Sequence, residues 1–199
     1  MIRYICGNIF DDDAQALVNT VNTDGVMGKG IALQFKERFP ENYRVYRQVC
    51  KEGRLDVGNM LIVEDSDRII VNFPTKKSWR RPSEYDFIKS GLLSLRKEII
   101  DRSIKSIAIP ALGSCNGGLD WARVKEMIVS ILDNLDCDIR IYEPNSKIVE
   151  QMKQERVRLT PARALMLSIM ADLVSFGEFV SVFAAEKLVY FLQRFGAKD

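Results

Sequence analysis

Residues 16–30 read ALVNTVNTDGVMGKG, a short apolar run followed by a glycine-rich turn. The apolar and β-branched residues of 16–22 predict a strand that is buried on both faces of a sheet. The stretch after the turn, residues 31–39, has a helical pattern and ends before Pro40. A strand that passes through glycines into a helix is typical of an α/β fold, in which helices cover a central sheet.

A second unit of the same kind comes later in the chain. Residues 106–110 predict a strand, the loop GSCNGG follows at 113–118, and a helix is predicted from Asp120 to Leu135. Residues 1–145 therefore predict one α/β domain with three layers, a mixed central sheet and helices on both faces. The other predicted elements are strands at 2–6, 59–64, 68–73 and 138–142, a hairpin turn at 65–67, and helices at 43–51 and from a Ser83 cap through Ile99.

The end of the chain differs in composition. Residues 146–159 are polar and charged and predict a linker. Thr160 and Pro161 predict a helix start, and helices are expected at 162–174 and about 182–195. Two helices cannot enclose a core of their own. They pack on the first domain, pair with another chain, or open a longer domain, and we favour the last interpretation for 160–199.

The composition excludes several kinds of chemistry. The chain has 199 residues, no histidine and a net charge of +2, so neither histidine-dependent catalysis nor a histidine metal site is available. The charge balance predicts neither a nucleic acid nor a membrane as partner, and no apolar run is long enough to span a membrane. The four cysteines stand alone, and no signal peptide is evident at the N-terminus. We therefore expect a cytoplasmic protein without a metal.

The two glycine-rich loops are the main functional indication. Loops of this kind present main-chain N–H groups, and the helix that follows adds a positive dipole end, so both favour phosphate. Neither loop fits a P-loop or a dinucleotide fingerprint. Glycines at such turns also occur only because the backbone needs a positive φ. Two loops at matching positions of one sheet nevertheless favour a diphosphate held between them.

Several motifs resemble the macrodomain family, which binds ADP-ribose. They are Gly7-Asn8-Ile9, residues 18–22, Gly28-Lys29-Gly30-Ile31-Ala32, residues 109–113 and residues 116–121. Residues 72–80, NFPTKKSWR, are similar to the branch that contains the DarG antitoxins and the human terminal ADP-ribose glycohydrolase. Residues 159–165 and 186–193 resemble the start of the second DarG domain, which is implicated in toxin neutralisation.

The resemblance implies a set of ligand-binding residues. Asn8 and Ile9 lie where the family holds adenine, although many members have Asp at the Asn8 position. Asn22, with Thr23, lies where the family contacts the distal ribose. Tyr142 and Asn145 are placed to cover the adenine, but Tyr142 also fits a half-buried strand aromatic. The remaining implied contacts are Thr75, the first phosphate loop of Gly28, Lys29, Gly30, Ile31 and Ala32, and the second of Leu112, Gly113, Ser114, Cys115, Asn116, Gly117, Gly118 and Leu119.

The resemblance also makes Lys76 the catalytic candidate. An amine can attack the anomeric carbon of the distal ribose and form a covalent intermediate that water resolves. The amine must be neutral, so its pKa must lie below the usual value of about 10.4 through desolvation or neighbouring cations. Lys77, Arg80 and Arg81 are the expected cationic neighbours. Alternatively, residues 76–81 form a solvated basic run, which with Trp79 also suits a nucleic-acid strand.

Three positions in or beside the second loop bear on the mechanism. The human relative pairs its lysine with an Asp, whereas Gly117 stands at that position here. Asp120 lies nearby, but its place favours a helix cap over an acid. Cys115 stands where the family usually has Gly, and we expect no nucleophilic role for it.

The resemblance implies an antitoxin-type hydrolase that removes ADP-ribose from thymidine in single-stranded DNA and so reverses a DarT-like transferase toxin. Its implied partners are the ADP-ribosylated strand and the toxin, and no cofactor is expected. Two alternatives stay open. One is a module that binds ADP-ribose without turnover, and the other is an antitoxin that acts by direct contact with the toxin.

Overall fold

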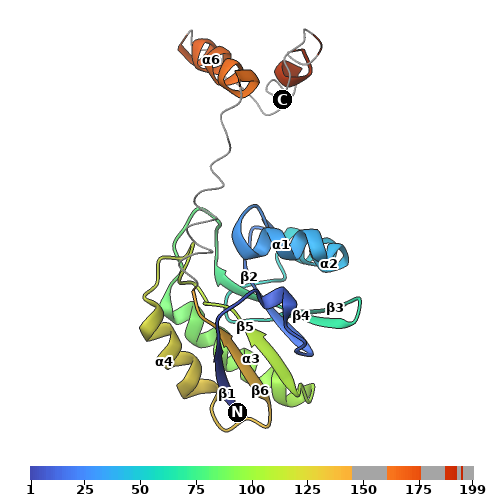
Figure 1. Ribbon diagram of the computed structural model, residues 1–199, viewed down its shortest axis with the longest axis vertical. Coiled ribbons are helices and arrows are strands. Elements are labelled where there is room, and N and C mark those ends of the chain that lie inside the picture. Colours follow the sequence, from blue (N-terminus) through green and yellow to red (C-terminus); the bar gives the residue numbers. More distant parts are fainter. Residues whose placement is uncertain (145–160, 176–186, 192–193, 195–199) are drawn as a thin grey trace. The chain divides into compact units, whose positions relative to one another are not determined.

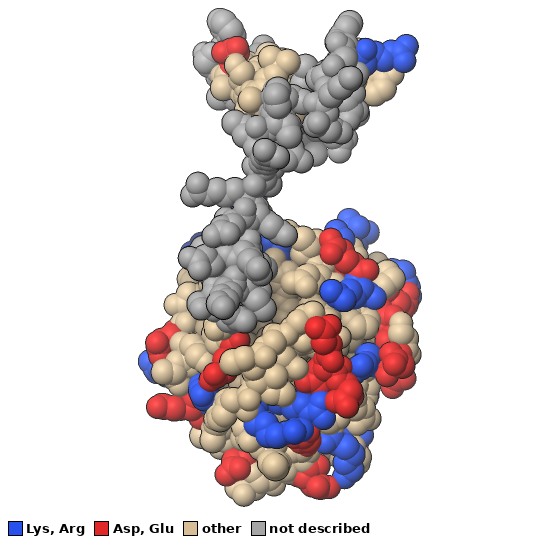
Figure 2. Space-filling view, viewed as in Figure 1, with Lys and Arg blue, Asp and Glu red and all other residues tan. Residues whose placement is uncertain are grey.

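The computed structural model describes residues 1–144, 161–175, 187–191 and 194. The chain divides into two compact units, Met1–Met152 and Lys153–Asp199, each considered by itself. In the first unit a central sheet lies between two layers of helices (Figure 1). On the face shown in Figure 2, acidic and basic side chains of this unit are interspersed, in keeping with the net charge of +2.

The sheet has six strands in the order β1-β6-β5-β2-β4-β3. All neighbours run parallel except β3 and β4, which form an antiparallel hairpin, so the mixed sheet predicted from the sequence is confirmed. Because β2 lies between β5 and β4, the residues that follow these three strands meet at one edge of the sheet. The strands are β1 Ile2–Ile5, β2 Ala16–Asn22, β3 Leu61–Asp65, β4 Arg68–Lys76, β5 Ser106–Ile109 and β6 Asp138–Tyr142.

Each face of the sheet buries its own apolar cluster. Ala16 and Val18 point toward α3 and α4, whereas Leu17 packs on the opposite face with Phe35 of α1. This alternation follows from the period of two in a strand and produces the three layers predicted from the sequence. The helices are α1 Gly30–Arg38, α2 Pro40–Lys51, α3 Tyr85–Asp101 and α4 Trp121–Leu132, with a short 3-10 turn, η1, at Ile9–Asp11.

Helix α3 lies very close to the sheet at Gly91. A Cβ atom at Gly91 would lie 2.3 Å from Cζ of Phe73, a distance that atoms in contact do not reach. Phe73 is fully buried and is the largest side chain that β4 contributes to this face. The glycine therefore allows the helix to rest directly on the aromatic ring.

A group of buried asparagines joins the opposite helix layer to the sheet. Asn19 of β2 donates to Asn72 of β4 at 3.0 Å, and Asn72 donates to Asn42 of α2 at 2.6 Å. The main-chain N–H of Asn42 donates to Asp65 at 2.8 Å. All three asparagines are 0% exposed, and their amides pair within the protein except for the Asn19 oxygen, which has no hydrogen-bond partner in the described ranges. No local pattern in the sequence predicted this group, because its members come from three separate elements.

Most element bounds agree with the sequence prediction, and three differences matter. Strand β4 continues to Lys76 instead of ending at Phe73, because Pro74 is accommodated within it. Helix α2 begins at Pro40, three residues before Tyr43. The prediction of a Ser83 cap is wrong: α3 begins at Tyr85, and the Ser83 hydroxyl is buried without a hydrogen-bond partner.

In the second unit, α6 spans Pro161–Ser175, which agrees with the predicted helix start at Thr160 and Pro161. Of the helix predicted at about 182–195, residues 187–191 and 194 are described and are helical. The predicted linker, residues 146–159, lies outside the described residues. Within the described ranges, no helix is both long and apolar enough to cross a membrane.

Candidate functional site

The candidate site lies at the carboxyl ends of β2, β4 and β5. Asn22, the last residue of β2, is the register partner of Lys76, the last residue of β4. The register shifts between Val21 and Asn22, so the pairing of the two strands is irregular at this point. The loop after β2 leads into α1, and the loop after β5 leads into α4. Both glycine-rich loops therefore lie at the same edge of the sheet as the end of β4, which agrees with the prediction of two loops at matching positions of one sheet.

The first loop is shaped by the side chain of Asn22. Its amide oxygen accepts the N–H groups of Asp24 at 3.0 Å and Val26 at 3.2 Å, and its amide nitrogen donates to the carbonyl of Val26 at 2.6 Å. The buried hydroxyl of Tyr46 donates to the Asn22 carbonyl at 2.7 Å. Asn22 is thus a loop-building residue here, and its contact with a distal ribose stays a prediction.

The first loop leads into α1, whose N-terminus has no side-chain cap. Lys29 is the N-cap of α1, and no side chain hydrogen-bonds to the free N–H groups of the first turn. That turn carries no acidic residue, and Gly30 has a φ of +63°. The N–H groups and the positive end of the helix dipole therefore stand open to an anion. Gly28 and Lys29 are exposed, while Ile31 and Ala32 pack partly on the core.

The second loop is a tight turn around Gly113. Gly113 has a φ of +65°, and its carbonyl accepts the N–H of Leu119 at 3.1 Å. Gly117 is buried inside this turn: a Cβ there would lie 2.1 Å from the Gly113 oxygen and 2.3 Å from the Ser83 hydroxyl. The Ser83 N–H donates to the Gly117 carbonyl at 3.0 Å and so fixes the turn from outside. Position 117 has room for glycine alone.

The other predicted residues of this loop divide into two groups. Leu112 is fully buried, and Leu119 packs on the same core, so both anchor the loop. The Ser114 hydroxyl donates to the Leu112 carbonyl at 3.2 Å. Cys115, Asn116 and Gly118 are exposed at the rim. Thr75, in β4, is buried, and its hydroxyl donates to the Val21 carbonyl at 3.5 Å.

Lys76 bridges β4 to the second loop. Its Nζ donates a hydrogen bond to the main-chain carbonyl of Asn116 at 2.5 Å. Desolvation lowers the pKa of Lys76, and the positive charge of Lys29 lowers it further. A depressed pKa is what a nucleophilic amine requires. Lys29, at the start of α1, is thus the cation that acts on Lys76; the expectation that Lys77, Arg80 and Arg81 do so is wrong.

Comparisons with known proteins agree with this geometry. The family model for the Macro domain matches residues 18–128. The structure of the macrodomain of Mycobacterium tuberculosis DarG has 48% sequence identity and a TM-score of 0.71, over 73% of this chain and 99% of that one.

The chain belongs to the macrodomain family.

Two further relatives extend the comparison. The DNA ADP-ribosyl glycohydrolase of Thermus aquaticus is 42% identical over 208 aligned positions, which cover 98% of this chain and 57% of that protein. The structure of Thermosipho africanus DarTG in complex with ADP-ribose is 36% identical with a TM-score of 0.65, over 69% of this chain and 40% of that one. This chain thus spans about half the length of the curated relatives it matches.

In the macrodomain, Asp120 has the structural role that its position favoured. Its carboxylate accepts the N–H of Arg123 at 3.0 Å and caps α4. Asp24 accepts the N–H of Trp79 at 3.0 Å. Within the described residues no carboxylate pairs with Lys76. Desolvation raises the pKa of Cys115, which keeps its thiol protonated and agrees with the absence of a nucleophilic role.

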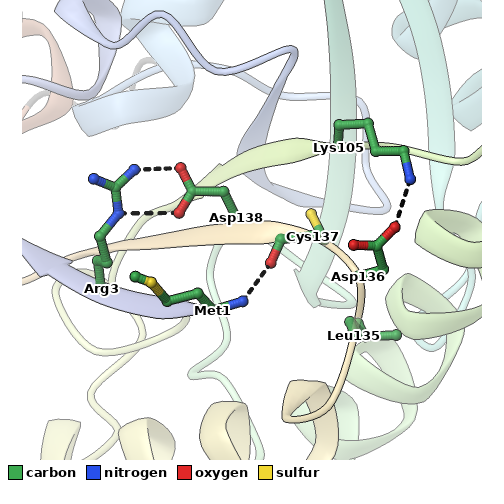
Figure 3. A pocket seen from close by; sticks show the side chains of 7 residues that line it. All are labelled: Met1, Arg3, Lys105, Leu135, Asp136, Cys137 and Asp138. Carbon is green, nitrogen blue, oxygen red and sulfur yellow. Dashed lines mark hydrogen bonds and ion pairs between the residues drawn. The ribbon is translucent and has the colours of Figure 1, made fainter.

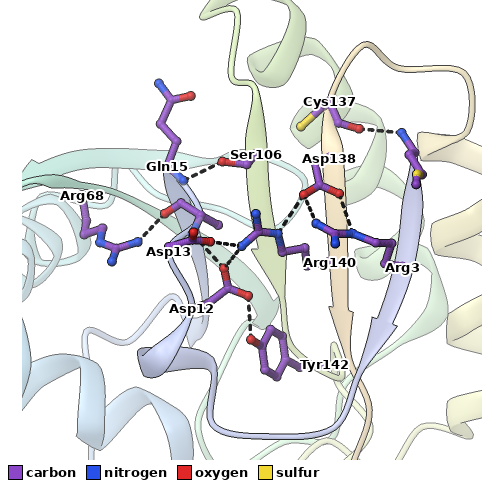
Figure 4. A network of polar contacts seen from close by, with 12 residues as sticks. Arg3, Asp12, Asp13, Gln15, Arg68, Ser106, Cys137, Asp138, Arg140 and Tyr142 are labelled. Carbon is purple, nitrogen blue, oxygen red and sulfur yellow. Dashed lines mark hydrogen bonds and ion pairs between the residues drawn. The ribbon is translucent and has the colours of Figure 1, made fainter.

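The adenine end predicted for the macrodomain contains a polar network that the sequence did not reveal. The buried Tyr142 donates its hydroxyl to Asp12 at 2.6 Å, and Arg140 pairs with Asp12, Asp13 and Asp138 (Figure 4). Tyr142 therefore fits the alternative of a packed strand aromatic, and its cover of an adenine stays a prediction. Ile9 is buried beside it.

Asn8 lies next to this network at the surface. The side chain of Asn8 is the cap of η1 and accepts the N–H of Phe10 at 3.3 Å. The amide oxygen of Asn8 thus has a structural role here, and its contact with adenine stays a prediction. Asn145 lies outside the described residues.

A hollow at the other edge of the macrodomain sheet is a weaker candidate. Met1, Arg3, Lys105, Leu135, Asp136, Cys137 and Asp138 line it (Figure 3). It lies at the amino ends of β1 and β6, away from both loops. Its charges pair with one another, Lys105 with Asp136 and Arg3 with Asp138. Within the described part of the chain, no group of three or more Cys, Asp or Glu is arranged to hold a metal.

Proposed function

We propose that the chain removes ADP-ribose from thymidine in single-stranded DNA, with Lys76 as the nucleophile, and so reverses a DarT-like transferase toxin. The observation that carries the proposal is the position of the Lys76 amine, which has a lowered pKa and lies beside the second of two anion-binding loops. The names of the relatives, DNA ADP-ribosyl glycohydrolase and DarTG in complex with ADP-ribose, support the same reaction and partner.

The loops hold the diphosphate in this proposal. The open N–H groups at the start of α1 face one phosphate, and the Gly113 turn faces the other. The distal ribose then lies at the end of β4, near Lys76. The first loop is preorganised by Asn22 and Tyr46, which lowers the entropic cost of binding.

The reaction has two steps. The neutral Lys76 amine attacks the anomeric carbon and forms a C–N bond, while the bond from that carbon to the base breaks and its electron pair goes to the base nitrogen. Water then attacks the same carbon, releases ADP-ribose and returns the electron pair to Lys76, and the proton that water gives up neutralises the thymidine anion. The ring nitrogen of thymidine that can carry ADP-ribose belongs to an acidic imide, so its anion leaves readily. This chemistry fits a loop whose position 117 cannot hold an acid, and it needs neither a cofactor nor a metal.

The test is single-turnover release of ADP-ribose from a thymidine-modified single-stranded oligonucleotide. Lys76→Ala is expected to abolish release and to keep ADP-ribose binding, measured by calorimetry. Lys97→Ala is the control, because Lys97 of α3 is exposed and is expected to keep release within about twofold of wild type. Tight binding with no release by the wild type would contradict the hydrolase and leave an ADP-ribose-binding module.

The second unit supports a second part of the proposal. The alignment with the Thermus aquaticus relative covers 98% of this chain and therefore extends past the macrodomain. We infer that residues 160–199 belong to a toxin-neutralising domain that is joined to the macrodomain by residues 146–159. Co-purification of a DarT-like toxin with the full chain but not with residues 1–145 tests this assignment. We also infer a cytoplasmic location, because the four cysteines are free and the proposed substrate is DNA.

A further inference from the structure

A short basic turn follows Lys76 directly. We define it as residues 77–81, which contain the exposed side chains of Lys77, Trp79, Arg80 and Arg81. Trp79 is 44% exposed, which is unusual for a ring of this size. The guanidinium carbon of Arg80 lies 4.4 Å from the centre of the Trp79 ring. The turn therefore presents a flat aromatic face together with positive charge.

The main chain of the basic turn is fixed to the first loop. The N–H of Trp79 donates to the Asp24 carboxylate at 3.0 Å. The carbonyl of Lys77 accepts the hydroxyl of Thr23 at 2.7 Å and the N–H of Thr23 at 3.2 Å. These bonds hold the turn between Lys76 on one side and the loop that leads into α1 on the other. The exposed ring is thus held at the edge of the candidate site.

The charges of the basic turn are available to a ligand. In the described part of the chain, no carboxylate forms an ion pair with Lys77, Arg80 or Arg81, whereas Arg3 and Lys125 each have one such partner and Arg140 has three. Lys77 lies over the Phe87 ring at 5.8 Å. The carboxylate of Asp24 does hydrogen-bond to the basic turn. It accepts the main-chain N–H of Trp79, however, and does not pair with a side-chain cation. An anionic partner could therefore pair with the positive charges of Lys77, Arg80 and Arg81.

We propose that the basic turn docks the DNA strand on which the modified thymidine lies: a neighbouring base stacks on Trp79, and phosphates pair with Lys77, Arg80 and Arg81. This inference rests on the proposed function and adds the path of the strand. A single strand is favoured over a duplex because unpaired bases are free to stack on an exposed aromatic ring, whereas a duplex would offer phosphates alone.

The experiment compares two substrates, ADP-ribosylated thymidine as a free nucleoside and the same nucleoside within a single-stranded oligonucleotide. Trp79→Ala keeps the main-chain bond to Asp24 and is expected to lower kcat/KM on the oligonucleotide about tenfold, with no change on the nucleoside. Replacing both Arg80 and Arg81 by Ala should lower kcat/KM on the oligonucleotide and make that kcat/KM less dependent on salt concentration. Leu93→Ala and Lys97→Ala, two exposed positions further along α3, are the matched controls.

Each outcome decides between the two proposals. Equal losses on both substrates, or no loss on the oligonucleotide, would overturn the strand path while leaving the hydrolase intact. If the wild type releases ADP-ribose from neither substrate, the proposed function fails. The strand path is then judged by fluorescence anisotropy with an unmodified oligonucleotide, where Trp79→Ala must weaken binding about tenfold relative to Leu93→Ala. Unchanged binding would overturn it.

Discussion

The Nζ of Lys76 donates a hydrogen bond to the main-chain carbonyl of Asn116, a residue 40 positions further along the chain. The bond joins the end of β4 to the loop that follows β5. The position of the amine therefore depends on the shape of the second loop as well as on its own strand. A change in that loop is expected to act on the nucleophile even where it touches no substrate.

Lys29 is predicted to set the pH dependence of the reaction. The attacking amine must be neutral, so the single-turnover rate should rise with pH as Lys76 loses its proton. The charge of Lys29 disfavours protonated Lys76, so Lys29→Gln should raise the pKa of Lys76 and move the rising limb to higher pH. The rate is measured from about pH 6 to 10 at saturating protein, with Lys97→Gln as the control. An unmoved limb would contradict the role of Lys29.

Gly117→Ala is predicted to damage the second loop. The added Cβ would overlap the Gly113 carbonyl and the Ser83 hydroxyl, so the turn must open. We expect a loss of about 1–3 kcal/mol in the free energy of unfolding and at least tenfold weaker ADP-ribose binding. Gly28→Ala is the stability control, because its Cβ would make only an ordinary 3.6 Å contact with Val26. Equal melting temperatures for the two variants would refute the argument.

Gly91→Ala is predicted to separate α3 from the sheet. Its Cβ would lie 2.3 Å from the Phe73 ring, which has no room to move in the core. Overpacking of this kind costs about 1–3 kcal/mol, measurable by urea unfolding. Phe73→Leu in the same chain should recover part of that loss, since the smaller side chain leaves space. Additive losses in the double variant would show that the two residues do not compete for space.

Tyr46→Phe is predicted to loosen the first loop. The Tyr46 hydroxyl is buried and donates to the carbonyl of Asn22, and the Phe variant leaves that carbonyl without this donor. We expect a loss of about 1–3 kcal/mol in the free energy of unfolding and weaker ADP-ribose binding with unchanged chemistry at saturation. Tyr43→Phe on the same helix is the control. A lower single-turnover rate at saturation would place Tyr46 in the reaction rather than in the loop.

The sequence was informative where a local pattern decides the structure. The apolar run of 16–22 predicted β2 with the bounds observed, and the strand predicted at 138–142 has the bounds of β6. The glycine spacing likewise located both loops. Pro74 misled the prediction of β4, because proline lacks the N–H that a strand interior uses, yet the strand continues to Lys76.

Contacts between distant segments were not predictable in the same way. The pairing of Arg140 with Asp12 spans 128 positions, and the effect of Lys29 on Lys76 joins the start of α1 to the end of β4. Neither interaction corresponds to a pattern among neighbouring residues of the sequence. Ser83 looked like a helix cap from its neighbours, and only the packing of the Gly113 turn against it shows why its hydroxyl is buried.

The closed space at Gly117 also limits how this chain can change over evolutionary time. Because the nearest obstacle is the carbonyl oxygen of Gly113, no replacement of a neighbouring side chain makes room for a carboxylate. A lineage with this turn would have to rebuild its main chain before an acid at that position could be inherited.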